Sequence, residues 1–386
     1  MAYSNNHYVP RLVLRRYNTE KLTIYNVKTG EVHKDKQLTE IFAEQDLYGE
    51  ELEKLLAKRV ESPFAQILTQ KILPAAINSE IELSRKELNI IKKFLLVEQM
   101  RVFTEEGEKY YQADQRVADK QSKIFKYPFK EADIENETVK ERWLRNLRVI
   151  VECSDLNHIQ DHELCTYDVY RWAQIYNSGY LAIWDCSETE EDFIVTDMGM
   201  TSERELNAFP VLEFDKKLYL LEQQETEKDP HRRKLYEELL FAQFNFHENF
   251  YMFSISKNRM IVIINPFFRL FDKAEKMPEP DIWPTVIDRS LYAKNRAQIL
   301  PTAFGKRIFR DSDLFWYRVL PMSLEDLRWV NMLMLDRIDT IVGFSDIEKI
   351  VDSVCDYKDF YDDMGQEMRV NYNPLIKYFK DNDIID

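Results

Sequence analysis

The spacing of apolar residues changes along the chain, and this change restricts the possible folds more than any other feature. From about residue 50 to residue 126, apolar side chains recur three and four positions apart, which is the period of an α-helix. After residue 179 they form short runs separated by acidic or turn residues, which indicates strands. The chain therefore predicts an α+β fold, in which a helical lobe precedes a mixed lobe with antiparallel strands.

Two short patterns in the first hundred residues predict particular elements. Alternating apolar residues at 22–27, a Thr-Gly turn at 29–30 and a return segment at 31–33 predict an N-terminal strand hairpin. Ser84 and Glu87 have the spacing of a capping box and precede apolar residues at helical intervals. A helix is therefore expected to begin at this point.

The remaining elements follow from the same two periods. Strands are expected at 180–184 and 193–196, joined by an acidic turn, at 210–214 and 218–221 as a second hairpin, and at 251–256, 260–264 and 341–344. Helices are expected around 143–150, at about 232–246, from Ser323 through Met334, and after a cap at 345–348, where the last helix begins.

The length of the chain bears on its domain organisation. A chain of 386 residues exceeds the size at which one hydrophobic core usually stops growing. We therefore expect an N-terminal hairpin and helical lobe in residues 1–175 and a mixed α+β lobe in residues 176–386. The two lobes are expected to form one compact body.

The composition is that of a folded protein and disfavours membrane insertion. Hydrophobic residues make up 45% of the chain and aromatic residues 13%, which is too much for a disordered protein. No apolar run reaches the ~18 residues of a membrane helix, and the first residues do not resemble a signal peptide. With only four cysteines, a disulfide framework is not expected either. The expected location is the cytoplasm, with no membrane partner.

The charge and the short motifs exclude several classes of function. A formal net charge of −15 opposes non-specific attraction to nucleic acids, because phosphate binding depends on lysine and arginine side chains. The chain has no Walker loop, dinucleotide-binding glycine pattern, nucleophile elbow or HExxH helix, and it has only eight glycines. The usual nucleotide-binding enzymes are therefore set aside.

Four potential zinc ligands occur close together in the sequence: Cys153, His158, His162 and Cys165. If this segment were helical, His158 and His162 would lie one turn apart and Cys165 at the next turn, where three ligands could converge on zinc. The spacing matches no known zinc module, and the neighbouring acidic residues suit an exposed polar segment. We therefore expect neither a metal nor another cofactor.

Several motif-like segments follow one another along nearly the whole chain. They are HYVP at 7–10 with Leu14 and Tyr17, Arg101 at the end of an apolar helix, FIVTD at 193–197, FSIS at 253–256, and Val330-Asn331 before IVGF at 341–344. This series resembles a bacterial family of unknown function that is recognised by an HYVP opening, a helix with Gln-x-x-Arg and a Thr-Ser-Asp-Asn-Pro strand end. Here Glu98 replaces the glutamine, and Thr-Asp-Met-Gly stands where Ser-Asp-Asn-Pro is commoner.

The resemblance implies a catalytic site formed by His7, Arg101 and Asp197. Histidine exchanges a proton near neutral pH, arginine stabilises an anion such as a phosphate, and aspartate orients an imidazole. Because the family is encountered among anti-phage defence genes, we expect a stand-alone defence effector, a nuclease that cleaves RNA or DNA without a metal after a phage protein triggers it. The same residues also suit structural roles. A non-enzymatic sensor of a phage component, or an interaction scaffold, remains the alternative.

Overall fold

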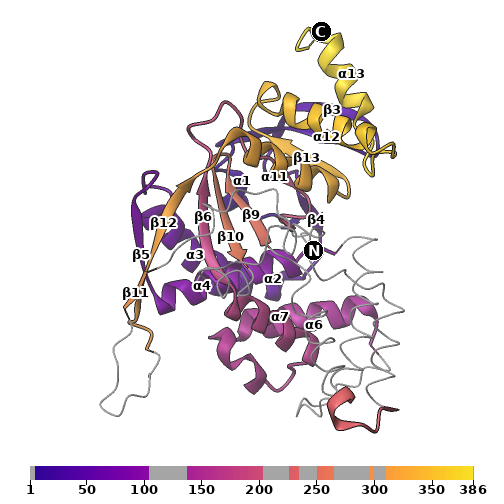
Figure 1. Ribbon diagram of the computed structural model, residues 1–386. Helices are drawn as coiled ribbons and strands as arrows, with labels where there is room; N and C mark the ends of the chain where they lie inside the picture. Colours follow the sequence, from indigo (N-terminus) through magenta and orange to yellow (C-terminus); the bar gives the residue numbers. More distant parts are fainter. Residues whose placement is uncertain are drawn as a thin grey trace.

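Strands from distant parts of the chain pair with one another, so long-range contacts hold the fold together. The computed structural model describes residues 5–103, 137–202, 226–233, 250–264, 296–298 and 310–385. Within these residues the strands form three sheets, with helices packed around them (Figure 1). The smallest sheet pairs β1 (Asn5–His7) with β4 (Ala43–Gln45) near the N-terminus.

The largest sheet contains seven strands: β5 (Glu80–Ser84), β6 (Tyr180–Asp185), β8 (Thr201–Ser202), β9 (Phe250–Ser256), β10 (Arg259–Ile264), β11 (Arg296–Gln298) and β12 (Leu314–Pro321). Their order is β11-β12-β6-β10-β9-β8, and β5 also pairs with β12. β12 runs parallel to β6, whereas the other pairs are antiparallel. The sheet therefore combines strands from both halves of the chain.

The remaining sheet joins the two ends of the chain. β13 (Ile341–Phe344) lies between β2 (Lys21–Asn26) and β7 (Val195–Thr196), and β3 (Glu31–Gln37) follows β2 at the edge. All of these pairs are antiparallel. The pairing of β13 with β2 joins residues from both sides of the lobe boundary expected between residues 175 and 176. The boundary itself stays a prediction.

The helices form two groups, and none of those described is long and apolar enough to cross a membrane. The N-terminal group is α1 (Arg11–Leu14), α2 (Glu50–Leu56), η1 (Ala57–Glu61), α3 (Ser62–Ile67), η2 (Leu68–Ile72), α4 (Arg85–Met100), α6 (Val139–Glu152), η3 (Leu156–Asp161) and α7 (Tyr167–Ser178). The C-terminal group is α11 (Leu324–Asp336), η6 (Glu348–Ile350), α12 (Val351–Asp363) and α13 (Asn373–Asp381). η1 and η2 are π-helical turns within one long helical run, and η3 and η6 are 3-10 helices.

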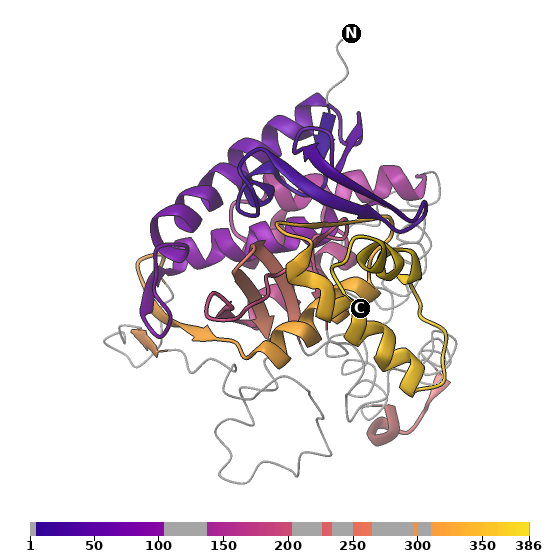
Figure 2. The ribbon, with the colours of Figure 1, turned by 90° about the horizontal axis from the view of Figure 1, so that it is seen from above.

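The central strand β6 is buried on both faces and separates two apolar cores. Leu181 and Ile183 belong to the core that contains α3, α4, α6 and α7, whereas Ala182 and Trp184 belong to the core that contains α11 and α12. Successive side chains of a strand point to opposite faces, so a strand between two cores must be apolar at nearly every position. Figure 2 shows the strands between the violet N-terminal helices and the yellow C-terminal helices.

The structure confirms most of the expected elements. β2 and β3 form the predicted hairpin, and α4 begins with the reciprocal capping box of Ser84 and Glu87. α11 begins after Ser323, whose hydroxyl accepts a hydrogen bond from the Asp326 N–H. The α+β fold is therefore confirmed.

Two expectations were only partly right. The strand expected at 193–196 contains only Val195 and Thr196, and it pairs with β13 in another sheet instead of with β6. A helix does follow residues 345–348, because η6 continues directly into α12, but it is not the last helix, since α13 follows it. The hairpin expected at 210–221 and most of the helix expected at 232–246 lie outside the described residues.

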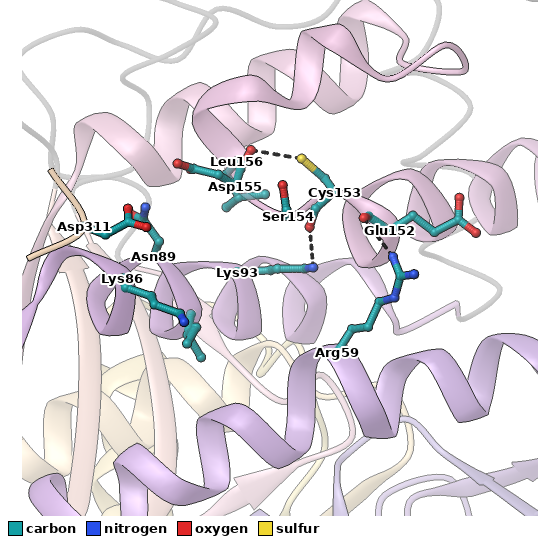
Figure 3. Close-up of a pocket in the computed structure, with 11 residues that line it drawn as sticks. Arg59, Lys86, Asn89, Lys93, Glu152, Cys153, Ser154, Asp155, Leu156 and Asp311 are labelled. Carbon is teal, nitrogen blue, oxygen red and sulfur yellow. Dashed lines mark hydrogen bonds between the residues drawn. The ribbon is translucent and has the colours of Figure 1, made fainter. Parts of the chain in front are cut away.

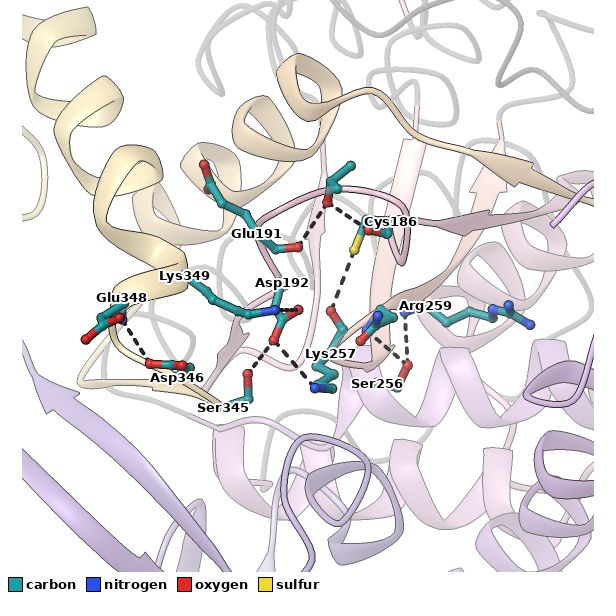
Figure 4. A network of polar contacts seen from close by, with 12 residues as sticks. Cys186, Glu191, Asp192, Ser256, Lys257, Arg259, Ser345, Asp346, Glu348 and Lys349 are labelled. Carbon is teal, nitrogen blue, oxygen red and sulfur yellow. Dashed lines mark hydrogen bonds and ion pairs between the residues drawn. The ribbon is translucent and has the colours of Figure 1, made fainter. Parts of the chain in front are cut away.

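Buried polar contacts fasten the segment before β7 to the C-terminal elements. The Asp192 side chain is almost fully buried, and its Oδ2 accepts a hydrogen bond from Ser345 Oγ at 2.6 Å. Lys349 Nζ lies 3.3 Å from Asp192 Oδ1, and Lys257 Nζ lies 3.9 Å from Oδ2 (Figure 4). One carboxylate therefore joins the β6–β7 connection, the β9–β10 turn and the turn after β13.

Asn331 on α11 makes a second set of contacts to the same segment. Its Nδ2 donates to the Asp192 carbonyl at 3.1 Å and to Ser353 Oγ at 3.2 Å, and its Oδ1 accepts the Ile194 N–H at 3.4 Å. Asn331 is fully buried, so the hydrogen bonds replace those that water would supply. This asparagine, part of one of the motif-like segments, therefore has a structural role.

We expect Asn331→Leu to lower the free energy of unfolding by about 1–3 kcal/mol, because the Ile194 N–H and Asp192 carbonyl would lose a partner in a buried place. Urea-induced unfolding measures the change. Asn382→Leu is the matched control, since Asn382 is exposed and makes only a local bond to the Tyr378 carbonyl. Equal stability of the two variants would contradict the structural role of Asn331.

Candidate functional site

The C-terminal end of α4 is held in place by two aromatic side chains. The Tyr48 hydroxyl donates to the Arg101 carbonyl at 2.7 Å, and Trp143 Nε1 donates to the Met100 carbonyl at 2.6 Å. The last carbonyls of a helix have no partner within the helix, so these bonds satisfy them. They also fix the position from which the Arg101 side chain extends.

Arg101 is fully buried and lies between two carboxyl groups. Its Nη1 is 2.9 Å from Glu61 Oε1 and 3.0 Å from Glu98 Oε1, and its Cζ lies 5.7 Å from the centre of the Tyr48 ring. Nε and Nη2 make no hydrogen bond to any residue in the described ranges. The guanidinium therefore retains donors suited to an anion. We call His7, Tyr48, Glu53, Glu61, Glu98 and Arg101 the Arg101 centre.

The carboxyl groups of the Arg101 centre outnumber its cation. Burial raises the pKa of Glu98 to about 8, although the adjacent Arg101 acts in the opposite direction. Burial also raises the pKa of Glu53, on α2, and the negative charge of Glu61 adds to this effect. The raised pKa shifts Glu98 toward its protonated form, in which its hydroxyl would be a donor beside the guanidinium.

His7, at the end of β1, supplies an imidazole to the same centre. Its Nε2 lies 3.0 Å from the Leu38 carbonyl, which only accepts hydrogen bonds, so Nε2 carries the proton. Burial lowers the pKa of His7, and the positive charges of Arg11 and Arg101 lower it further. The ring is therefore neutral at pH 7 and has a lone pair on Nδ1. The side chain is only 8% exposed.

Asp197 anchors a turn. Its carboxylate accepts backbone N–H groups from Asp339 at 3.1 Å, from Ile341 at 2.9 Å and from Thr340. Burial raises the pKa of Asp197 to about 6, while these three bonds act to lower it. Both oxygens are thus occupied by the segment that leads into β13.

The turn after Asp197 nevertheless approaches the Arg101 centre. Gly199 has a φ of +65°, and a Cβ atom at this position would lie 3.9 Å from Glu98 Oε2. The negative charge of Asp197 also helps to raise the pKa of Tyr8, the residue after His7. The structure thus places His7 within electrostatic reach of Arg101 and Glu61, and Asp197 lies near the same region but is bound to backbone groups.

Sequence patterns singled out Glu98 as well, but they did not identify Tyr48, Glu53 or Glu61. Tyr48 follows β4, Glu53 lies on α2 and Glu61 ends the π-helical turn η1. A π-helical turn changes which residues share a face of a helix, and helical periodicity does not predict where it occurs. Acidic residues at helical spacing near residue 50 were the available signal, but they also suit an exposed face.

The Cys/His segment does not have the geometry that zinc would require. Residues 156–161 form a 3-10 helix instead of an α-helix, and His158 and His162 contact different acidic residues, Asp161 and Glu152. Cys153 donates its thiol to the Asp155 carbonyl at 2.9 Å. Among the residues that the structure describes, no group of three or more histidine, cysteine, aspartate or glutamate side chains is placed to hold a metal.

A comparison with known protein families finds one family whose model covers most of the chain. A model for a protein family of unknown function, DUF4238, matches residues 5–346, which is most of the chain. The chain belongs to this family. No curated protein and no solved structure matches this chain.

The raised pKa of Glu98 has a consequence for the pH dependence of stability. A carboxyl group whose pKa rises from 4.5 to about 8 on folding stabilises the fold fully only below the lower value, and this contribution is lost as the pH rises to about 8. Within this window the wild type is expected to lose up to about 1.4 kcal/mol of unfolding free energy per pH unit relative to Glu98→Gln. Above about pH 8, the difference in unfolding free energy between the wild type and Glu98→Gln should become constant. Urea-induced unfolding of both proteins from about pH 5 to about pH 9 measures this difference.

Comparing the wild type with Glu98→Gln cancels the contributions that other titrating groups make to stability. Lys93, whose pKa burial lowers to about 8, changes stability in the opposite direction, but it is present in both and cancels. If the two pH profiles are parallel throughout, the pKa of Glu98 is not raised on folding and the electrostatic description of the centre is wrong.

For Asp197→Asn we expect a loss of about 1–3 kcal/mol in unfolding free energy, because an amide offers one acceptor oxygen to three N–H groups. The loss should be accompanied by faster hydrogen exchange of the Thr340 and Ile341 amides. Asp346→Asn is the control, since Asp346 is exposed and accepts a single backbone N–H. Unchanged stability with lost activity would instead assign Asp197 to the chemistry.

Proposed function

We propose that the chain is an acid–base hydrolase of phosphodiesters, a metal-independent nuclease that cleaves RNA or DNA. The observation that supports this proposal is the composition of the Arg101 centre. A neutral imidazole at His7, a protonated carboxyl at Glu98 and the free donors of Arg101 are a base, an acid and an anion-binding group. These three groups suit a reaction in which two protons move at an anionic ester.

Each proton in the proposed reaction has a defined donor and acceptor. His7 Nδ1 takes a proton from the attacking water molecule as the water oxygen bonds to phosphorus. Nε and Nη2 of Arg101 bind the non-bridging oxygens of the phosphate, where negative charge is highest. The Glu98 carboxyl gives its proton to the leaving oxygen as the second P–O bond breaks. Asp197 acts as a positioning residue that holds the adjacent turn.

The departure from the resembled family at position 98 fits this assignment. The family pattern expects glutamine there, and a protonated glutamic acid has nearly the same shape and also offers a donor and an acceptor. The raised pKa thus lets Glu98 replace a glutamine at neutral pH and adds a proton that can be transferred. Glu98→Gln should therefore fold well and lose the general acid.

A non-enzymatic binding protein is the second candidate. The observation that favours it is the complete burial of Arg101 against Glu61 and Glu98, which leaves a substrate little access to the guanidinium. A buried, paired arginine of this kind also holds a fold together. In this case the family-like residues would position a surface that recognises a phage component, or a scaffold surface.

The biological setting belongs to the same proposal. The resemblance implies a cytoplasmic, stand-alone effector of anti-phage defence that stays inactive until a phage protein triggers it. The net charge of −15 supports a latent nuclease, because it limits indiscriminate binding to the nucleic acids of the host. An acidic sensor would share this property.

The nuclease proposal predicts that His7→Ala and His7→Gln reduce cleavage of labelled RNA or DNA by about 100-fold or more, because a general base is removed. The assay contains a chelator, and activity is expressed per folded molecule. His7→Gln keeps an N–H group for the Leu38 carbonyl, so it separates chemistry from folding. His33→Ala is the control, since it removes a partly exposed imidazole from β3.

Plaque formation on cells that carry each variant distinguishes the two candidates. Protection that is lost with His7→Gln but kept with His33→Ala, together with nucleic-acid cleavage after infection, supports the nuclease. Protection that survives in His7→Gln refutes the nuclease and leaves the binding protein as the function.

A further inference from the structure

A separate cavity lies between α4, the end of α6 and the segment before β12 (Figure 3). Its volume is about 470 Å³, which is within the range of small-molecule sites. Three basic side chains line it, Arg59 from η1 and Lys86 and Lys93 from α4, together with the amide of Asn89. A cavity with three cations is unexpected in a chain with a net charge of −15.

Lys93 and Arg59 face the C-terminal end of α6. Lys93 Nζ donates to the Val151 carbonyl at 2.7 Å and to the Cys153 carbonyl at 2.6 Å, and Arg59 Nη1 donates to the Glu152 carbonyl at 3.0 Å. These bonds satisfy helix-terminal carbonyls and use only part of the donors of each cation. One ammonium N–H and several guanidinium N–H groups remain for a ligand.

Negative charge also does not fully compensate the positive charge of the cavity. Arg59 and Lys86 are exposed, and neither forms an ion pair with a residue in the described ranges. Burial lowers the pKa of Lys93 to about 8, and the positive charge of Arg59 acts in the same direction. Arg59 and Lys93 are therefore close enough to repel one another, and an anion between them would relieve this repulsion.

The acidic residues at the cavity cancel only part of these charges, because Glu152 is paired with other basic groups. The Glu152 carboxylate is directed away from the other lining side chains (Figure 3). It accepts a hydrogen bond from Arg148 Nε at 2.9 Å and lies 3.3 Å from His162 Nε2. Asp155 Oδ1 accepts both the backbone N–H and the side-chain amide of Asn157. Asp311 is an exposed lining residue whose carbonyl accepts the Lys86 N–H. The basic groups thus outnumber the carboxylates that remain at the cavity.

We propose that this cavity is a binding site for a terminal phosphate group, with Arg59, Lys86 and Lys93 as ligands of the phosphate oxygens. A phosphate group offers several oxygens and more than one negative charge, which suits three cations that approach from two helical elements. The cavity is also large enough for more than the phosphate itself. The phosphate source is either a free nucleotide-like molecule or the end of a nucleic acid.

The site is distinct from the Arg101 centre but shares two elements with it. η1 carries Arg59 at the cavity and Glu61 at the Arg101 centre, and α4 carries Lys93 at the cavity and Arg101 at its end. The proposal does not depend on nuclease activity, because His7 takes no part in the cavity.

Isothermal titration calorimetry of the full chain with pyrophosphate, ATP and adenosine, in chelator and moderate salt, tests the proposal. Pyrophosphate or ATP is expected to bind with a Kd below about 1 mM, and adenosine is not expected to bind. The double variant Arg59→Gln/Lys86→Gln should weaken binding by about 100-fold, because two charge-assisted contacts are lost. Both residues are exposed, so this variant is expected to fold.

The matched control is Lys58→Gln/Lys380→Gln, which removes the same charge from exposed residues outside the cavity. It should bind like the wild type, as should His7→Gln. Oligonucleotides with and without a 5′-phosphate identify the source: a preference for the phosphorylated form over ATP indicates a nucleic-acid end, and the reverse a free nucleotide. Absence of phosphate binding, equal binding by both double variants, or adenosine binding as tightly as ATP would each overturn the proposal.

Discussion

The burial of Arg101 is the constraint on which the N-terminal half of the structure depends. Removing a guanidinium from water costs several kcal/mol, and the cost is offset only if carboxyl groups and hydrogen bonds surround it. Glu98 comes from the same helix, whereas Glu61 comes from a π-helical turn and Tyr48 from the segment after β4. The pairing of Arg101 therefore holds the helical run and the end of α4 together.

The central strands connect this arrangement with the C-terminal half. β6 and β10 are apolar on both faces, so they require helices on each side, and α4 and α11 meet that requirement from opposite sides. The polar residues Asp192 and Asn331 then hold the connection from β6 to β7 against the C-terminal elements. Asp197 continues this series by binding the segment that leads into β13. Asp192 and the positioning residue Asp197 therefore lie on one connected segment, and both bind C-terminal elements.

The sequence predicted the elements whose signals are local. The capping box at Ser84 and the hairpin of β2 and β3 depend on residues a few positions apart, and both are present. The pattern at 193–196 was right only for Val195 and Thr196, because Phe193 and Ile194 are buried in the C-terminal core without strand pairing, so the apolar run there partly reports burial. The zinc interpretation assumed a continuous helix, whereas residues 156–161 form a 3-10 helix.

For the candidate site, the sequence by itself determined the kinds of group available: an imidazole at His7, a guanidinium at Arg101 and a carboxyl at Asp197. Only the tertiary structure decided their pKa values and their hydrogen-bond partners. Burial lowers the pKa of His7 and raises that of Glu98, and three backbone N–H groups, the nearest 142 positions distant in sequence, occupy Asp197. Protonation and pairing depend on solvent exclusion and on partners from distant segments, and these exist only after the chain has folded.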